Sequence, residues 1–309
     1  MQVFHFDAQP LHLPEGHRFP HHKYRALRER LAGVPGLRLQ AAPAAAWDAV
    51  GLVHDPAYMA RVRDGGLTPA EQREIGFPWN PGMPVRALHS VGATLAATEA
   101  AWREGVALNL GGGTHHAKAD AGGGYCVFND VAVATRWLQR QCWVQRVAVI
   151  DLDVHQGNGT ASIFAGDERV FTLSLHGEKN FPFRKVASSL DVDLPDDCGD
   201  GAYLSALDQA LDELAHRFPA PQFAFYLAGA DPHEGDRLGR LRLSRDAMAA
   251  RDTTVLHWLW QRQVPAVVTM AGGYPTDLDA MLDVQVQTVR LAQGHWGRWK
   301  NAADPVERP

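Results

Sequence analysis

The sequence predicts a single α/β domain with three layers, α/β/α, in which helices cover both faces of a mainly parallel central sheet. Short apolar runs alternate along the chain with longer segments of helical periodicity. The short runs are apolar on both faces, which is typical of parallel strands buried between helices. No linker rich in Gly, Ser or Pro divides the 309 residues, so we expect residues 1–309 to form one domain.

Each expected element follows from its own pattern. The strands are the apolar runs VFHF, VALNL, VAVI, VFTLSL, FAFYL and AVVTM, at residues 3–6, 106–110, 147–150, 170–175, 223–227 and 266–270. The helices show apolar residues three or four positions apart, at residues 21–31, 89–103, 130–141, 203–217, 244–262 and 278–291. Residues 65–84 and 177–201 are rich in Pro, Gly and aromatic residues, which predicts loops that help form a site. The polar tail at 300–309 is expected to be frayed.

Composition excludes several classes of protein. With 30 Lys and Arg against 35 Asp and Glu, the net charge is −5, and no cluster of basic residues is present that could bind nucleic-acid phosphates. No run approaches the roughly 20 apolar residues of a membrane helix, and no secretory signal pattern opens the chain. The cysteines, Cys126, Cys142 and Cys198, have no C-x-x-C spacing, which argues against disulfides or a thiolate zinc site. We therefore expect a cytoplasmic protein without nucleic-acid or membrane partners; the oligomeric state stays open.

Histidine is unusually frequent, with 15 residues, and several lie where expected strands end. Polar segments follow five strands: GGGTHHAKAD, DLDVHQGNG, SLHG, AGADPHEGD and AGGY. Ligands of open parallel sheets bind just beyond the carboxyl ends of the strands. These segments are therefore expected to converge on one site.

The segment DLDVHQGNG predicts a metal site. In an extended strand Asp151, Asp153 and His155 share one face, and buried carboxylates need a partner. With Asp231 from another strand end, Asp153 and His155 would supply three ligands and leave one position open, as in catalytic zinc sites. The alternative interpretation is that these aspartates are helix N-caps and the histidine is a core residue.

Two further groups suggest acid–base chemistry near such a metal. His115 and His116 follow three glycines, and imidazole has a pKa suited to a general base. Tyr274 follows two glycines and could donate to a developing oxyanion, although a tyrosine in a glycine turn is an equally common structural feature. Cys126 is a weaker candidate nucleophile, since free cysteine is most often a small buried hydrophobe.

Together, GGGTHHAKADAGGGYCVFND, VIDLDVHQGNG, TLSLH, AGADPHEGD and AGGY resemble the zinc-dependent histone deacetylase family, in the family's order across residues 109–274. EGHRFPHHKY and LVHDPAYMARV extend the resemblance upstream. The chain looks most like the class IV branch, because Asn158 replaces the usual Asp and the chain is a bare catalytic domain. The resemblance implies the arginase/deacetylase-like fold.

The resemblance assigns roles residue by residue. It implies that zinc is held by Asp153, His155 and Asp231, and that the catalytic residues are His115, His116, Tyr274, Asp151 behind His115, and Asn158 behind His116. It implies a structural potassium ion at Asp151, Asp153, His155, Ser174 and Leu175. The implied substrate-binding residues are Gly124, Tyr125, Phe183 and Gly273. Lys23 falls where many relatives have an arginine in an internal channel, so its role is open.

Departures from the family pattern bear on mechanism. An amide at Asn158 stabilises the His116 imidazolium far less than a carboxylate would, which favours a neutral His116 acting as base. Position 233 is His where arginase-type enzymes need an aspartate that bridges two manganese ions, and Asp236 is too far along the chain to replace it. One metal is therefore favoured over two.

The resulting hypothesis is hydrolysis of an N-acyl amide. Water activated by zinc attacks the carbonyl, His116 accepts its proton, Tyr274 stabilises the oxyanion and a protonated histidine releases the amine. The expected substrates are proteins or peptides carrying acetyl-lysine or longer acyl-lysine, with acetylpolyamines or other small amides as the alternative. A dinuclear manganese ureohydrolase and a non-catalytic module that binds acyl-lysine are the more distant alternatives.

Overall fold

Eight strands form one sheet in the computed structural model, which describes residues 1–9 and 11–302. The strands are β1 (Gln2–His5), β2 (Arg38–Ala41), β3 (Val106–Asn109), β4 (Val147–Asp151), β5 (Val170–Gly177), β6 (Leu190–Leu194), β7 (Phe223–Leu227) and β8 (Ala266–Thr269). Their order is β2-β1-β3-β8-β7-β4-β5-β6, and all seven pairings are parallel. The predicted α/β class with a mainly parallel sheet is confirmed.

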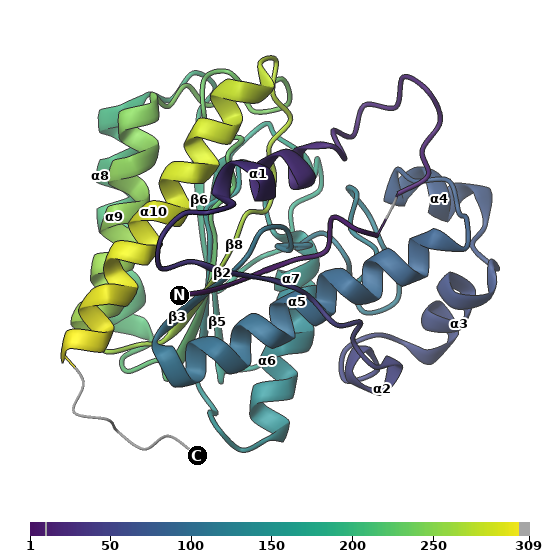
Figure 1. Ribbon diagram of the computed structural model, residues 1–309, viewed down its shortest axis with the longest axis horizontal. Coiled ribbons are helices and arrows are strands. Elements are labelled where there is room, and N and C mark those ends of the chain that lie inside the picture. The colour runs from purple at the N-terminus through teal and green to yellow at the C-terminus, as the bar shows by residue number, and fades with distance from the viewer. Residues whose placement is uncertain (10, 303–309) are drawn as a thin grey trace.

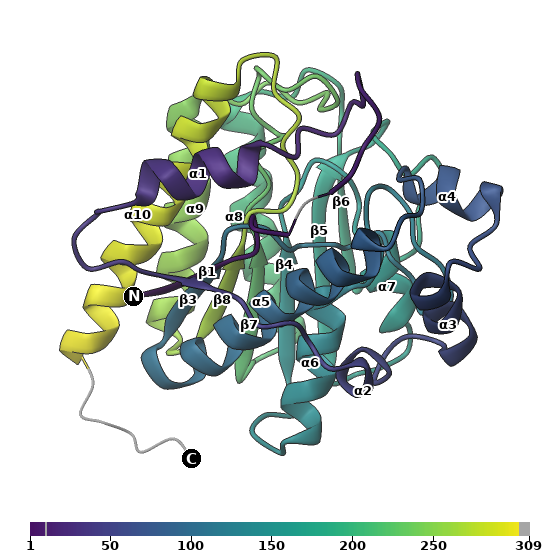
Figure 2. The same cartoon turned by 45° about the vertical axis from the view of Figure 1, so that its right-hand side comes forward.

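Helices cover both faces of this sheet (Figures 1 and 2). One face carries α1 (Lys23–Leu31), α8 (Asp200–Arg217), α9 (Arg245–Gln261) and α10 (Leu278–Ala302), and the other carries α5 (Gly82–Glu104) and α6 (Asp130–Arg140). The short helices α2 (Trp47–Val50), α3 (Pro56–Asp64) and α4 (Pro69–Ile75) gather to one side, and α7 (Asn158–Ile163) follows β4. No helix in the described part of the chain has both the length and the apolar character needed to span a bilayer.

The two segments expected to be loops are partly regular, so this prediction is corrected. Within 65–84, α4 occupies Pro69–Ile75 and α5 already begins at Gly82. The helix α4 has a local cause, because Thr68 and Glu71 form a capping box and Gly76 ends the helix with φ 83°. Within 177–201, β6 pairs with β5 while the stretch before it is irregular. The tail was also expected to fray from residue 300, but α10 continues to Ala302; residues 303–309 lie outside the described residues.

Two helical glycines give opposite predictions for stability. A Cβ at Gly92 in α5 would overlap the carbonyl oxygen of Pro43, whereas a Cβ at Gly294 in α10 would meet open space. We expect Gly92→Ala to lower the free energy of unfolding by about 1–3 kcal/mol through overpacking. Gly294→Ala should raise it by up to about 1 kcal/mol through helix propensity. Urea titrations measure the free energy of unfolding of both variants. Equal changes in this free energy would contradict the close approach of Pro43 to α5.

The strand order determines where a site can form. The central strands β3, β8, β7 and β4 are direct neighbours although they come from distant parts of the chain. Their carboxyl ends therefore bring four separate loops to one edge of the sheet. The loops that follow these strands contain the polar segments GGGTHH, AGGY, AGAD and DVHQG.

Candidate active site

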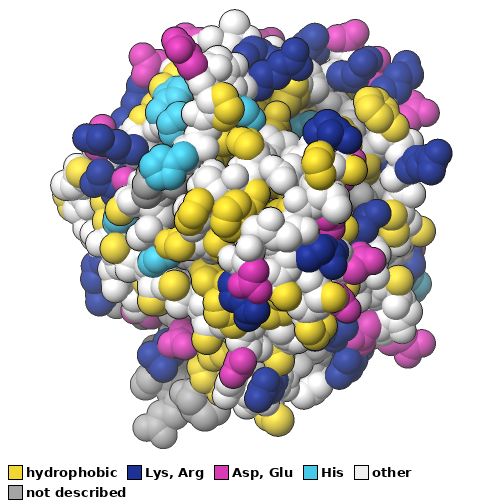
Figure 3. All heavy atoms as spheres, turned by 90° about the vertical axis from the view of Figure 1, so that its right-hand side faces the viewer, with side chains coloured by type: hydrophobic (Ala, Val, Ile, Leu, Met, Phe, Trp, Pro, Cys, Tyr) yellow, Lys and Arg dark blue, Asp and Glu magenta, His cyan; other side chains and the backbone are white. Residues whose placement is uncertain are grey.

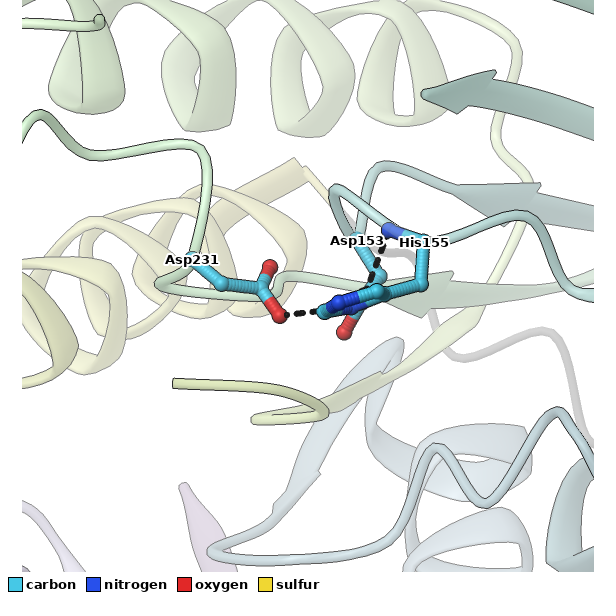
Figure 4. Close-up of side chains that lie close together, drawn as sticks. All are labelled: Asp153, His155 and Asp231. Atoms are coloured by element: carbon cyan, nitrogen blue, oxygen red, sulfur yellow. Dashed lines mark hydrogen bonds and ion pairs between the residues drawn. The ribbon is translucent and has the colours of Figure 1, made fainter. Parts of the chain in front are cut away.

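The predicted metal ligands lie together at the ends of β4 and β7 (Figure 4). One ligand atom each from Asp153, His155 and Asp231 can be chosen so that all three lie within 4.8 Å of one another. His155 Nδ1 is 2.9 Å from Asp153 Oδ1 and 3.2 Å from Asp231 Oδ2, and all three side chains are buried. The arrangement matches a site with one nitrogen and two oxygen donors.

The local backbone differs from the extended strand expected for this segment. The strand β4 ends at Asp151, and residues 153–155 form a bend. Asp151 Oδ1 accepts a hydrogen bond from the Asp153 amide at 3.1 Å, and Asp153 Oδ1 accepts one from the His155 amide at 2.9 Å. These side-chain to backbone bonds curve the chain. Asp153 and His155 consequently reach the metal site from a turn and not from one strand face.

The charges of the three side chains fit a divalent cation. Burial and the neighbouring Asp153 carboxylate raise the pKa of Asp231 to about 7 when no metal is present. Asp231 Oδ2 is buried and receives no hydrogen bond among the described residues. Two buried carboxylates that lie close together are costly without a positive partner, so the donor set suits a divalent cation held by these residues.

The side chains at this site provide ligands for one metal ion. Among the described residues, Asp153, His155 and Asp231 are the one group of three or more His, Cys, Asp or Glu side chains close enough to share an ion. The Asp236 carboxylate instead accepts hydrogen bonds from the backbone amides of Leu238, Gly239 and Tyr274. It is therefore not available as the second ligand set that a dinuclear site needs.

Two histidines lie next to the triad and have different partners. His115 Nδ1 is 2.6 Å from Asp151 Oδ2, and His116 Nδ1 is 2.7 Å from Asn158 Oδ1. The two Nε2 atoms are 3.1 Å apart, and both rings are buried. The predicted pairing of each histidine with its partner is therefore present in the structure.

The surroundings of the two histidines move their pKa values in opposite directions. Burial disfavours the His115 cation, but the charges of Asp151 and Asp153 outweigh it and raise the pKa of His115 to about 9. Burial, together with the charges of His115 and His155, holds the pKa of His116 well below its usual value. A neutral His116 donates its Nδ1–H to the Asn158 oxygen, which leaves Nε2 as its basic atom.

Two of the residues assigned to potassium, Ser174 and Leu175, lie on β5 beside Asp151. Ser174 is the direct neighbour of Asp151 in the β4–β5 pairing, and Leu175 follows it on β5. The histidine of the segment SLHG, His176, is buried with Nδ1 3.0 Å from the Ser174 hydroxyl and Nε2 2.9 Å from Asp193. The polar contacts of His176 are thus with β5 and its neighbour β6.

A pocket with aromatic walls leads to the triad. It is lined by Gly124, Tyr125, His116, His155, Tyr274, Phe181, Leu238 and the end of α4. The His116 ring packs against Gly124, where a Cβ would clash, and Tyr125 has φ 66°. On the molecular face shown in Figure 3, basic and acidic side chains are interspersed.

Phe183 does not occupy the position predicted for it. Its side chain is 86% exposed, whereas Phe181 lines the pocket with its ring centroid 4.8 Å from that of His116. The segment FPF offers a phenylalanine on either side of Pro182, and the sequence alone could not decide which one turns inward. Cys126 is also buried, and burial raises the pKa of its thiol, which does not favour a nucleophile.

Tyr274 and Gly273 lie at the end of the β8 loop. The Tyr274 ring centroid is 6.2 Å from that of His155 and 5.7 Å from that of Tyr125. Burial and the carboxylates of Asp153 and Asp231 raise the pKa of the Tyr274 phenol well above its usual value. The phenol is therefore a hydrogen-bond donor at neutral pH.

Comparisons with known proteins identify the family and support the fold. The Histone deacetylase domain family matches residues 17–288. An uncharacterised protein of Picosynechococcus sp. is 41% identical over 271 residues, which are 86% of this chain and 89% of that protein. A Histone deacetylase-like amidohydrolase of Pseudomonas aeruginosa is 31% identical over 77% of this chain and 66% of its own length. Histone deacetylase 2 of Arabidopsis thaliana is 36% identical, and the match spans about half of that protein, 48%. The structure of a homologue from Aquifex aeolicus has a TM-score of 0.80 at 21% identity, covering 100% of this chain and 91% of the other.

Proposed function

Because this chain belongs to the histone deacetylase family, whose members hydrolyse amide bonds, we propose that it removes acyl groups from N-acylated lysine or related amines. The observation that carries the proposal is the buried triad of Asp153, His155 and Asp231 beside two histidines with different pKa values. We further propose the class IV branch, on the strength of Asn158, and a cytoplasmic location.

We propose zinc as the ion of the triad, since two carboxylates and one imidazole with an open position are typical of catalytic zinc. When bound, zinc supplies a Lewis acid that polarises a carbonyl and lowers the pKa of water. The potassium ion is proposed at Asp151 and Ser174, with the carbonyl groups of Asp153, His155 and Leu175.

The histidines divide the proton transfers. His116 is the base, because its lowered pKa keeps it neutral and able to accept a proton from water. His115, whose pKa the Asp151 carboxylate raises, stabilises negative charge that develops on the substrate. The imidazolium formed at His116 then returns its proton to the leaving amine, so the cycle restores both histidines.

Asn158→Asp should shift the acid limb of the pH–kcat/KM profile to higher pH. A carboxylate 2.7 Å from Nδ1 would stabilise the His116 imidazolium and raise its pKa, so the histidine would lose its basic form at a higher pH. Asn158→Ala, which removes the amide without adding charge, is the matched control and should not move the limb upward. An unchanged acid limb in Asn158→Asp would contradict His116 as the base.

The substrate is tested with a panel of peptides that carry acetyl-, butyryl-, octanoyl- and myristoyl-lysine, together with acetylated polyamines. Acetylated polyamines are included because the rat polyamine deacetylase HDAC10 is 30% identical over 75% of this chain. Turnover of a lysine peptide by zinc-loaded protein supports the proposal, and preference for the polyamines supports the alternative. Absence of turnover on every amide would contradict an amidohydrolase.

A further inference from the structure

One peptide group in the β8 loop is held from both ends by charged side chains. Lys23 Nζ donates a hydrogen bond to the Gly273 carbonyl oxygen at 3.0 Å. Asp236 Oδ2 accepts one from the Tyr274 amide at 2.5 Å. The Gly273 carbonyl and the Tyr274 N–H belong to the same peptide bond, so a cation and a carboxylate grip its opposite ends.

Lys23 has no other strong polar partner among the described residues. Its side chain is 2% exposed, and no carboxylate in that part of the chain lies within ion-pair distance of it. The ammonium is surrounded by aromatic rings, at 5.3 Å from the Tyr24 centroid, 5.3 Å from Tyr274 and 5.9 Å from Phe19. A buried cation is costly without a partner, and here that partner is the Gly273 carbonyl.

Asp236 lies at the opposite end of the peptide group, and both of its carboxylate oxygens accept backbone hydrogen bonds. Its Oδ1 accepts hydrogen bonds from the amides of Leu238 and Gly239, at 2.8 and 2.9 Å, which fixes the carboxylate in the loop after β7. The neighbouring Arg237 amide donates to the Tyr274 carbonyl at 3.0 Å. The loop after β7, which also carries Asp231, is thus bonded on both sides of Tyr274.

We propose that Lys23 and Asp236 are positioning residues that clamp this peptide group and thereby hold the Tyr274 phenol beside the metal site. Both charges align with the peptide dipole, and a flipped peptide would point its oxygen at the carboxylate and its N–H at the ammonium. Gly273, with φ 150°, has no side chain to restrain the backbone. The inference rests on the proposed function for the role of Tyr274, but not for the clamp itself.

The kinetic test uses Lys23→Met and Asp236→Asn, each alone and combined with Tyr274→Phe. Methionine keeps the length of Lys23 in an apolar pocket, and asparagine keeps the shape of Asp236 while it replaces one acceptor by a donor. We expect each single variant to lower kcat about 10-fold with unchanged KM and unchanged zinc affinity. In the Tyr274→Phe background each should lower kcat less than 2-fold, because their effects pass through that phenol.

Matched controls are Lys179→Met and Asp64→Asn, which make the same chemical changes at exposed side chains and should leave kcat unchanged. Equal losses with and without the Tyr274 hydroxyl would overturn the clamp. So would a folded Lys23→Met or Asp236→Asn variant with the kcat of the parent protein.

A second readout does not depend on activity. Hydrogen exchange of the Tyr274 amide should be slow in the parent protein and at least 10-fold faster in Asp236→Asn and Lys23→Met, with the rest of β8 unchanged. Unchanged exchange in both variants would overturn the clamp. If the parent protein hydrolyses no amide, the proposed function fails, and the exchange rates still decide whether the peptide is clamped.

Discussion

Replacing Asp231 by asparagine is expected to lower kcat/KM by at least about 10³-fold and to remove bound zinc at micromolar concentrations of the ion. Asp231 is fully buried, and its Oδ2 is the ligand atom without a hydrogen bond among the described residues. An amide in its place offers a neutral oxygen or a nitrogen that carries protons, neither of which balances the charge of a divalent cation. The loss therefore reflects the metal and not a missing contact with substrate.

The measurement is zinc content per chain after dialysis, paired with steady-state kinetics. Asp208→Asn makes the same change at an exposed position of α8 and should retain zinc and activity. A chelator should inactivate the parent protein, and added zinc should restore it, whereas Asp231→Asn should not respond. An Asp231→Asn protein with one zinc per chain and full turnover would remove Asp231 from the ligand set.

Buried strands were predictable from sequence because their patterns are local. The run FAFYL was predicted at residues 223–227 and forms β7 with the same bounds. By contrast, β2 has the sequence RLQA and lies mostly exposed at an edge, and β6 alternates leucine or valine with aspartate. Edge strands need little apolar surface, so they leave no apolar run to detect.

The site was predictable to the extent that parallel topology brings strand ends together. That rule places Asp153, Asp231, His116 and Tyr274 at one edge without any knowledge of loop conformation. It says nothing about the direction of side chains in irregular segments, which is why Phe183 was chosen and Phe181 was missed.

Contacts between distant segments were also beyond the sequence. Lys23 bonds to a carbonyl 250 positions away, and no periodicity or spacing relates the two residues. The unequal pKa values of His115 and His116 depend in the same way on burial and on every charge nearby. From the sequence, a difference in pKa between the two histidines could be expected only because a carboxylate, Asp151, lies behind His115 and an amide, Asn158, lies behind His116.

Replacing Tyr274 by phenylalanine is expected to lower kcat by about 10² or more, with little change in KM. The hydroxyl would act as a hydrogen-bond donor to the oxyanion, whose charge is present in the transition state and not in the bound substrate. Burial and the two carboxylates of the triad keep the phenol protonated, so its donor function persists across neutral and moderately alkaline pH. No alkaline limb should therefore originate from Tyr274 in the parent protein.

The Tyr274→Phe protein separates this role from metal binding and from folding. Zinc content and the midpoint of thermal unfolding should equal those of the parent, since the phenyl ring keeps its contacts with Tyr125 and His155. The loss of kcat should also appear for every acyl chain length, because the oxyanion is common to all amides. A variant with full activity would exclude Tyr274 as the donor. An effect restricted to long acyl chains would instead show that the tyrosine contributes to the wall of the pocket and not to stabilisation of the oxyanion.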